Sequence, residues 1–239
     1  MADTKIAAKI KALLTLAEHP GTPEHERLAA AEKAAELMEK YAIDELMARG
    51  IEERHTDKVT RRNYVYNGVY SKAMRQACCS LAAALDMRSL YMDGHNDEVT
   101  ILVYGFESDF GKFETLLASL TLQMNTAFKL WKKEHADGWA TMDSHDRYYS
   151  KRSFLMGYGS GFSSRVRAGR NHAVQESGSG AELVLVDRKS RVDEHVEDAH
   201  PNLKKSRDLL VNGAYSHGRA AGQRANTGET TIGTRKAVK

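Results

Sequence analysis

The chain is organised around residues 150–176, which read SKRSFLMGYGSGFSSRVRAGRNHAVQE. Phe154, Leu155, Tyr158 and Phe162 recur there at helical spacing and give the segment one apolar face. The second half of the same segment is rich in arginine. We therefore expect a central helix whose apolar face packs in the core and whose basic flank faces a partner.

Glycines interrupt the middle of this predicted helix. Gly157, Gly159 and Gly161 would each cost about 1 kcal/mol relative to alanine in an exposed helix interior, so their concentration needs a structural reason. The first and last lie one turn apart, which lets another backbone approach closely. A GxGxG run also suggests phosphate binding. However, no strand precedes it and no Gly-Lys-Ser/Thr follows, so we reject a dinucleotide site or a P-loop.

A second face of small residues follows near the C-terminus. Gly218 and Gly222 are again one turn apart, in a predicted helix over residues 212–226. We expect this face to pack against the glycines of the central helix.

Apolar periodicity and turn residues predict the other elements of the chain. The expected elements are a strand within 58–70, a helix over 71–85, hairpin strands at 87–92 and 99–104, a helix over 108–134, a polar loop over 136–145, a strand at 182–186 that extends the hairpin to three strands, a basic turn at 187–191 and an acidic turn at 193–200. The fold class is therefore α+β and mostly helical, with long helices on a small antiparallel sheet. The predicted domains are an N-terminal helical hairpin over 1–50, a core over 58–226 and a mobile basic tail over 227–239.

The N-terminal segment carries the most specific pattern. Residues 9–44 read KIKALLTLAEHPGTPEHERLAAAEKAAELMEKYAID, in which a Thr-Pro-Glu cap begins an alanine-rich helix. This run resembles the module called domain of unknown function 2786, which occurs in bacterial proteins and in their phages. Later stretches, such as VYGFESDF and GAYSHGRAAGQRA, look like the longer proteins that carry it. The resemblance implies no activity and no catalytic residue.

Charge is distributed unevenly along the chain. The formal net charge is +3, but residues 146–192 carry +5 and residues 202–239 carry +6, with −4 between them at 193–201. Such asymmetry indicates an anionic partner for the C-terminal half, and a solvated surface is the alternative. We expect DNA or RNA, with Tyr148, Tyr149 and Trp131 as candidate stacking groups. The candidate phosphate-binding cations are Lys151, Arg152, Arg165, Arg167, Arg170, Arg188, Lys189, Arg191, Lys204, Lys205 and Arg207.

Two other functions remain open: a module that binds or inhibits a host protein through the N-terminal hairpin, and an enzyme. No spacing links a nucleophile to a base, so the enzyme is the weakest alternative and no cofactor is expected. The stretch DEHVEDAH at 193–200 holds ligand-type residues, but its histidines do not share a helix face, so no metal is expected. Cys78 and Cys79 are expected to be packed thiols in a cytoplasmic protein without a membrane span.

Overall fold

The computed structural model describes residues 57–177, 179–204, 209–225 and 227, together with isolated positions between Lys9 and Leu37. The described elements are β1 (Val59–Tyr66), α4 (Ser71–Ala84), β2 (Arg88–Asp93), β3 (Val99–Phe106), α5 (Glu107–Glu134), α6 (Ala136–Thr141), α7 (Ser144–Ser177), α8 (Ser179–Ala199) and α9 (Ala214–Gln223). The α+β class predicted from the sequence is confirmed. The predicted N-terminal hairpin lies almost entirely outside the described residues, as does the tail beyond residue 227.

The sheet has three antiparallel strands in the order β1-β3-β2. The register places Tyr104 of β3 opposite both Arg61 of β1 and Arg88 of β2. The predicted hairpin is confirmed as β2 and β3, joined by a turn in which Asn96 and Asp97 have positive φ. The third strand is β1, from the segment predicted as a strand at 58–70.

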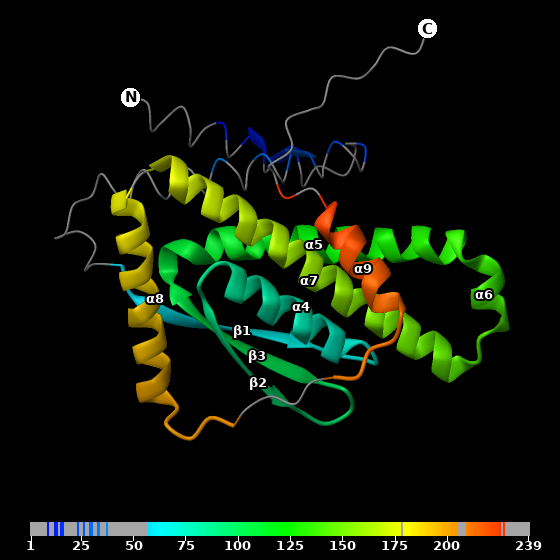
Figure 1. Cartoon of the computed structure of the whole chain (residues 1–239). Helices are drawn as coiled ribbons and strands as arrows, with labels where there is room; N and C mark the ends of the chain where they lie inside the picture. Colours follow the sequence, from blue (N-terminus) through cyan, green and yellow to red (C-terminus); the bar gives the residue numbers. More distant parts are fainter. Residues whose placement is uncertain are drawn as a thin grey trace, which may run out of the picture.

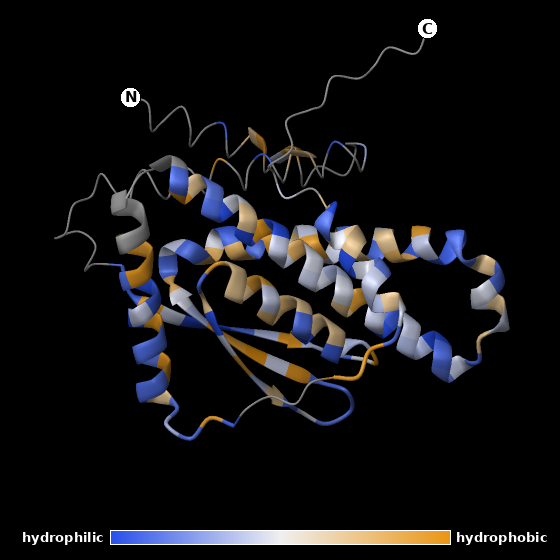
Figure 2. Cartoon of the chain, in the orientation of Figure 1, coloured by the Kyte–Doolittle hydropathy of each residue, from blue (hydrophilic) through white to orange (hydrophobic). Residues whose placement is uncertain are grey.

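The central strand β3 is buried on both faces because alternate side chains point to opposite sides of a sheet. Val99, Ile101 and Val103 join the main core beneath α4 and α5. On the other face, Leu102, Tyr104 and Phe106 pack with Val192 and Val196 of α8. Figure 1 shows α4 and α7 stacked over one face while α8 crosses the opposite one, and Figure 2 shows β3 coloured largely as hydrophobic.

Helix α8 corrects three sequence-based expectations. The predicted strand at 182–186, the basic turn at 187–191 and the acidic turn at 193–200 form one helix that ends at Ala199. From Val184 onward, its buried positions are Val184, Arg188, Val192 and Val196, which recur every four residues. An arginine at the second buried position interrupts the apolar pattern, so the helical period is hidden and the run ELVLV resembles a strand.

The predicted polar loop at 136–145 is also wrong, because it contains α6 and the start of α7. Arg147 donates hydrogen bonds to the Trp139 carbonyl (Nε, 3.2 Å) and the Ala140 carbonyl (Nη2, 3.0 Å) of α6. Asp143 accepts a hydrogen bond from the Asp146 amide at 2.8 Å, which caps α7. Side chains from the next helix therefore stabilise a short helix that its own sequence specifies poorly.

Close packing between α7 and α9 confirms the predicted contact of the two glycine faces. A Cβ atom at any of four glycines would lie within 2.2 Å of a carbonyl oxygen across the interface. The pairs are Gly157 with Tyr215 (2.1 Å), Gly161 with Arg219 (2.2 Å), Gly218 with Phe154 (2.0 Å) and Gly222 with Tyr158 (2.2 Å). The remaining glycine of the run, Gly159, faces α4, where a Cβ atom would lie 2.6 Å from that of Ala77.

Candidate nucleic-acid interface

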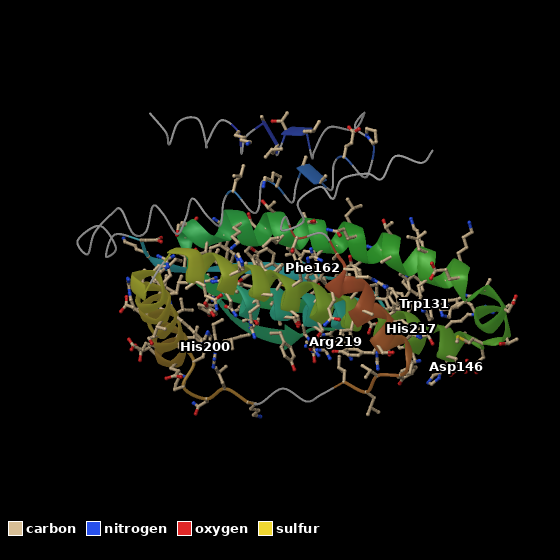
Figure 3. The ribbon with its side chains drawn as sticks, turned by 45° about the horizontal axis from the view of Figure 1, so that its top comes forward. Trp131, Asp146, Phe162, His200, His217 and Arg219 are labelled. Carbon is tan, nitrogen blue, oxygen red and sulfur yellow. The ribbon has the colours of Figure 1, made fainter. Side chains whose placement is uncertain are left out.

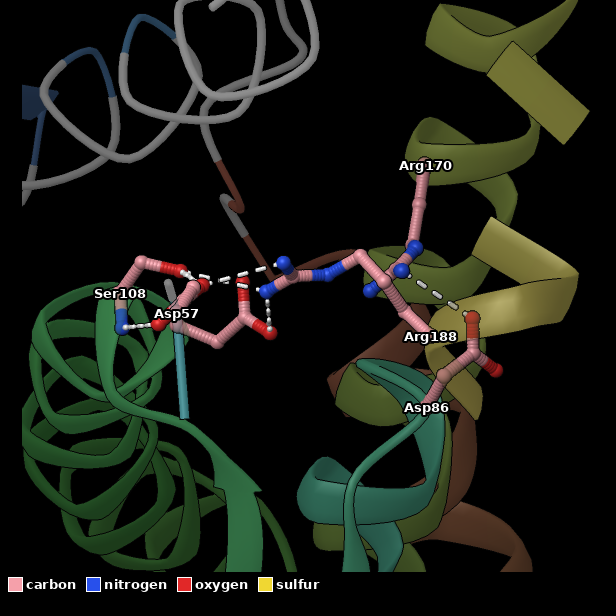
Figure 4. A network of polar contacts seen from close by, with 6 residues as sticks. Asp57, Asp86, Ser108, Arg170 and Arg188 are labelled. Atoms are coloured by element: carbon pink, nitrogen blue, oxygen red, sulfur yellow. Dashed lines mark hydrogen bonds and ion pairs between the residues drawn. The ribbon is translucent and has the colours of Figure 1, made fainter. Parts of the chain in front are cut away.

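Arg188, a predicted phosphate-binding residue, is instead buried in an ion-pair network (Figure 4). Its guanidinium lies 3.0 Å from a carboxylate oxygen of Asp57 and 2.9 Å from one of Asp109. It also donates to the Ser108 hydroxyl at 3.2 Å and lies 3.8 Å from the centroid of the Phe106 ring. Its side chain is only 8% exposed, so this charge holds α8 against the sheet and does not reach a ligand.

Two further predicted residues connect α7 with the chain around α9. Arg152 is buried and donates through Nη2 to the Leu210 carbonyl at 2.5 Å. Arg165 donates to the Gln223 carbonyl at 3.1 Å and to the Thr227 hydroxyl at 3.1 Å. These contacts use the guanidinium donors to satisfy backbone carbonyls, so both arginines are structural.

The side chains of Arg167 and Arg170, which belong to α7, contact the C-terminal end of α4. Arg167 donates to the Ala83 carbonyl at 2.6 Å, and Arg170 forms an ion pair of 3.1 Å with Asp86. A cation near a helix C-terminus is favourable because the last carbonyls carry partial negative charge. Asp86 has a φ of 57°, and the following Met87 amide donates to the Ala82 carbonyl at 3.0 Å, so Asp86 is the left-handed residue that ends α4.

Beside this helix end lies a cleft, which we call the basic cleft. It has a volume of about 720 Å³ and lies between α4, β2, α7, α8 and the segment after α8. Its charged lining residues are Arg88, Arg167, Lys189, Lys204, Asp86 and Asp193, and its apolar ones include Met87, Leu90 and Leu203. Ligand pockets commonly have volumes of about 300–1,000 Å³, so this cleft is large enough for several phosphate groups with attached organic groups.

Ion pairs neutralise only part of the positive charge in the basic cleft. Asp193 pairs with Arg88 at 3.3 Å, and Asp86 pairs with Arg170, which lies just outside the lining. Among the described residues, neither Lys189 nor Lys204 has a hydrogen-bond or ion-pair partner, and both are exposed. The cleft therefore offers two uncompensated ammonium groups and an exposed guanidinium, Arg167, to an anion.

The predicted interface is thus only partly assembled in space. Three predicted residues converge in the basic cleft (Arg167, Lys189 and Lys204), and they come from both basic blocks of the sequence. Arg191 instead lies 4.8 Å from the Phe106 ring centroid, on α8. Lys205 and Arg207 lie outside the described residues. Sequence reasoning missed Arg88, because it lies on β2 in a part of the chain without excess positive charge.

A second group of side chains lies at the opposite end of α4. We call it the aromatic patch, and it consists of Tyr70, Tyr148, Tyr149 and Lys151. The rings of Tyr70 and Tyr148 are stacked with centroids 5.6 Å apart, and Tyr149 contacts Tyr148 edge-on at 5.4 Å. The Lys151 ammonium lies 4.3 Å from the Tyr70 ring centroid. All four residues are partly exposed.

The environment of the aromatic patch disfavours the charged ammonium form of Lys151. Partial burial lowers the pKa of Lys151, and the nearby positive charge of Lys132 lowers it further. An anion bound next to Lys151 would raise this pKa, because a nearby opposite charge favours the ammonium form. Trp131, the third predicted stacking group, is only 9% exposed and packs among Phe128 and Phe154, so it is not available to a ligand.

Histidines occur in separate parts of the described fold. His217 of α9 lies beside Trp131 and His135, whereas His200 lies far from them, directly after α8, and shares a 2.6 Å hydrogen bond with the Tyr104 hydroxyl (Figure 3). Burial raises the pKa of Cys78 and of Cys79, which makes both thiols poor nucleophiles. These observations give no support to the enzyme alternative.

One group of potential metal ligands occurs among the described residues, and it lies outside the stretch DEHVEDAH at 193–200. Asp143, His145 and Asp146 could bring one ligand atom each within 4.8 Å of one another. All three are exposed, and Asp143 already caps α7. Exposed acidic groups of this kind carry no argument for a metal site.

Comparison with protein families gives a match in the N-terminal segment. The family model described as "Protein of unknown function (DUF2786)" matches residues 5–45, which confirms the resemblance seen in the N-terminal segment. No curated protein and no solved structure matches the chain. In the described residues, no helix combines the length and the hydrophobicity that crossing a membrane requires.

Proposed function

We propose that this protein binds nucleic acid, DNA or RNA, through the basic cleft. The observation that carries the proposal is the convergence of Arg167, Lys189 and Lys204 from distant parts of the sequence in one cleft. Phosphate groups are the anions that nucleic acids present in a continuous row, and lysine and arginine neutralise them with release of counterions. The N-terminal resemblance and the two free cysteines support an accessory protein of bacterial or phage origin that acts in the cytoplasm.

Binding through this cleft is expected to recognise the phosphate backbone more than the bases. Its positively charged groups are lysines and arginines, which are common partners of phosphate oxygens. We therefore expect weak dependence on sequence and a steep fall in affinity with salt. Each phosphate contact contributes about −0.9 to the slope of log K against log salt for duplex DNA, or about −0.7 for single strands.

The test is binding of fluorescent oligonucleotides, measured by anisotropy over a salt series. The double variant Lys189→Ala/Lys204→Ala is expected to weaken binding and to reduce the magnitude of the salt slope by about 2, because each lysine neutralises about one phosphate. Both lysines are exposed and unpaired among the described residues, so the variant should fold normally.

Lys129→Ala is the matched control. Lys129 is an exposed lysine of α5 that lines a separate groove with Tyr64 and Leu122. The control should bind with the affinity and salt slope of the wild type. No binding of either nucleic acid at low salt would refute the function, and equal affinity of the double variant and the wild type would refute the role of the cleft.

A further inference from the structure

We propose that the bound nucleic acid is single-stranded and extends from the basic cleft to the aromatic patch. This inference rests on the proposed function and adds the strandedness and the minimum length of the ligand. Phosphates would occupy the cleft beside Arg167 and Lys189, and unpaired bases would stack on Tyr149 and its neighbours. The geometry of α7 and of α4 carries the argument.

Helix α7 places the two sites on one side of the molecule. Tyr149 of the aromatic patch and Arg167 of the basic cleft are both on α7. Their separation of 18 positions corresponds to five helical turns of about 3.6 residues, so both project from the same side of the helix, about 27 Å apart.

Helix α4 connects the same two sites independently. Tyr70, which precedes its first residue, stacks on Tyr148, and the carbonyl of Ala83 in its last turn binds Arg167. The partly or fully exposed positions Lys72, Gln76 and Ala83 follow one another along α4 at helical spacing. The sequence of α4, SKAMRQACCSLAAA, contains no carboxylate that would repel a phosphate backbone.

The aromatic patch has the composition of a stacking platform. Sequence-tolerant binding of single strands combines a positively charged path for the backbone with aromatic rings on which bases stack. Tyr70 and Tyr148 already form a stack in which the rings are inclined by 24°, and Tyr149 lies edge-on beside Tyr148. The Arg152 guanidinium lies 4.5 Å and the His145 ring 4.4 Å from the Tyr149 ring centroid, so a base would stack on Tyr149 by displacing the exposed His145 side chain. Lys151 supplies a cation next to the rings. A duplex cannot use this platform, because its bases are stacked on one another.

The span sets the length of the ligand. At the rise of about 3.4 Å per nucleotide that one strand of B-DNA has, 27 Å corresponds to about eight nucleotides. A strand much shorter than this can occupy the cleft or the patch but not both. A longer strand occupies both, and the second contact then forms within the same complex, which raises the affinity.

The experiment measures the affinity of thymidine oligonucleotides from about 4 to about 12 nucleotides long, with a uridine RNA series and a duplex of the longest length alongside. For wild-type protein we expect the affinity to rise at least fivefold, roughly the effect of one stacked base, as the length passes about eight nucleotides. Tyr149→Leu retains bulk but not the ring, and should abolish this step without changing the affinity of the shortest oligonucleotide. Tyr149→Trp should retain the step.

The outcomes separate this inference from the proposed function. Loss of the step in Tyr149→Leu, with the thermal unfolding midpoint unchanged, supports a stacking role. The single-strand inference would be overturned by a smooth rise of affinity with length, by equal affinity for the duplex, or by a step that survives in Tyr149→Leu. In each of these cases, weaker binding by Lys189→Ala/Lys204→Ala would still support nucleic-acid binding at the basic cleft. Absence of binding to every oligonucleotide would overturn both. The DNA and RNA series show which of the two is preferred.

Discussion

Arg188 illustrates how one residue determines the position of a whole helix. The sequence presents it as part of a basic run, Asp187-Arg188-Lys189-Ser190-Arg191, and its neighbour Lys189 is indeed exposed. Its position on α8 directs Arg188 toward the sheet, where it forms ion pairs with Asp57 and Asp109. Two adjacent cations therefore have opposite roles because the helix turns by about 100° from one residue to the next.

Replacing Arg188 tests this structural role. Arg188→Met retains the apolar stem but leaves two carboxylates without their partner, and breaking a buried pair typically costs about 3–5 kcal/mol. We expect a loss near the lower limit, about 3 kcal/mol, because Asp109 is 33% exposed and water can solvate it. The free energy of unfolding from urea titrations followed by circular dichroism measures the effect.

Lys189→Met is the matched control for this prediction. It removes the adjacent, exposed cation, and surface substitutions usually change stability by less than about 0.5 kcal/mol. Equal stabilities of Arg188→Met and Lys189→Met would show that the buried network contributes nothing.

At the scale of elements, the contact between α7 and α9 depends on the absence of side chains. Four glycines allow the two backbones to approach so closely that no Cβ atom fits between them. Arg152, Arg165 and Asn212 add hydrogen bonds at the two ends of this interface. Helix α9 is short, so its position follows from this interface more than from its own helical propensity.

Gly157→Leu is expected to break the interface. A Cβ atom at this position would lie 2.1 Å from the Tyr215 carbonyl oxygen, and a backbone atom cannot move aside as the end of a side chain can. Overpacking usually costs about 1–3 kcal/mol, and we expect a loss at or above the upper limit because α9 must shift as a unit. Thermal unfolding followed by circular dichroism measures the change in midpoint.

The control for the glycine interface is Gly138→Leu in α6. A Cβ atom at Gly138 would meet nothing within 4 Å. This variant should unfold at or slightly above the wild-type midpoint, because glycine is a poor helix former. If both variants unfold at the wild-type midpoint, close approach at Gly157 is not required for stability.

How far the sequence predicts an element depends on whether its own pattern carries the information. Helices α4, α5, α7 and α9 and the β2–β3 hairpin were predictable, because apolar spacing, turn residues and paired glycines are local signals. Helix α8 was not predictable, because the buried Arg188 breaks its apolar stripe and ELVLV mimics a strand. Helix α6 was missed because side chains of the next helix stabilise its end.

The candidate site is less predictable than the fold, because its members meet only in the folded chain. Charge counting identified the exposed cations Arg167, Lys189 and Lys204 together with buried arginines such as Arg152 and Arg188, and it could not distinguish the two kinds. Arg88 was missed because its surroundings in the sequence have no excess of positive charge. What makes a cation available is its exposure in the folded chain, and this is a property of the tertiary structure.

At the scale of the whole molecule, Asp57 links the segment just before β1 to α8. The Asp57 carboxylate binds Arg188 of α8 at 3.0 Å and accepts a hydrogen bond from the Ser108 hydroxyl at 2.5 Å. Residues separated by 131 positions in the sequence thus share one ion pair. The predicted core domain over residues 58–226 would exclude this carboxylate, although it contributes to the packing of α8.

Two shortened chains test whether the core folds alone and whether Asp57 is part of it. A chain from Thr56 to Thr227 retains Asp57, whereas a chain from Lys58 to Thr227 lacks it. We expect both to fold and the second to be less stable by about 2 kcal/mol, the usual contribution of a hydrogen bond to a charged group. Denaturant unfolding of the two chains measures the difference.

Adding Arg188→Met to both chains determines whether the difference arises from the pair itself. If Asp57 acts through Arg188, removing the arginine should largely abolish the difference in stability between the two chains, because residues in one network are not additive. A difference that persists at full size would assign the effect of Asp57 to Ser108 or to the chain terminus. Failure of the longer chain to fold would mean that the core needs residues before Thr56 or after Thr227, and the predicted boundaries of the core domain would then be wrong.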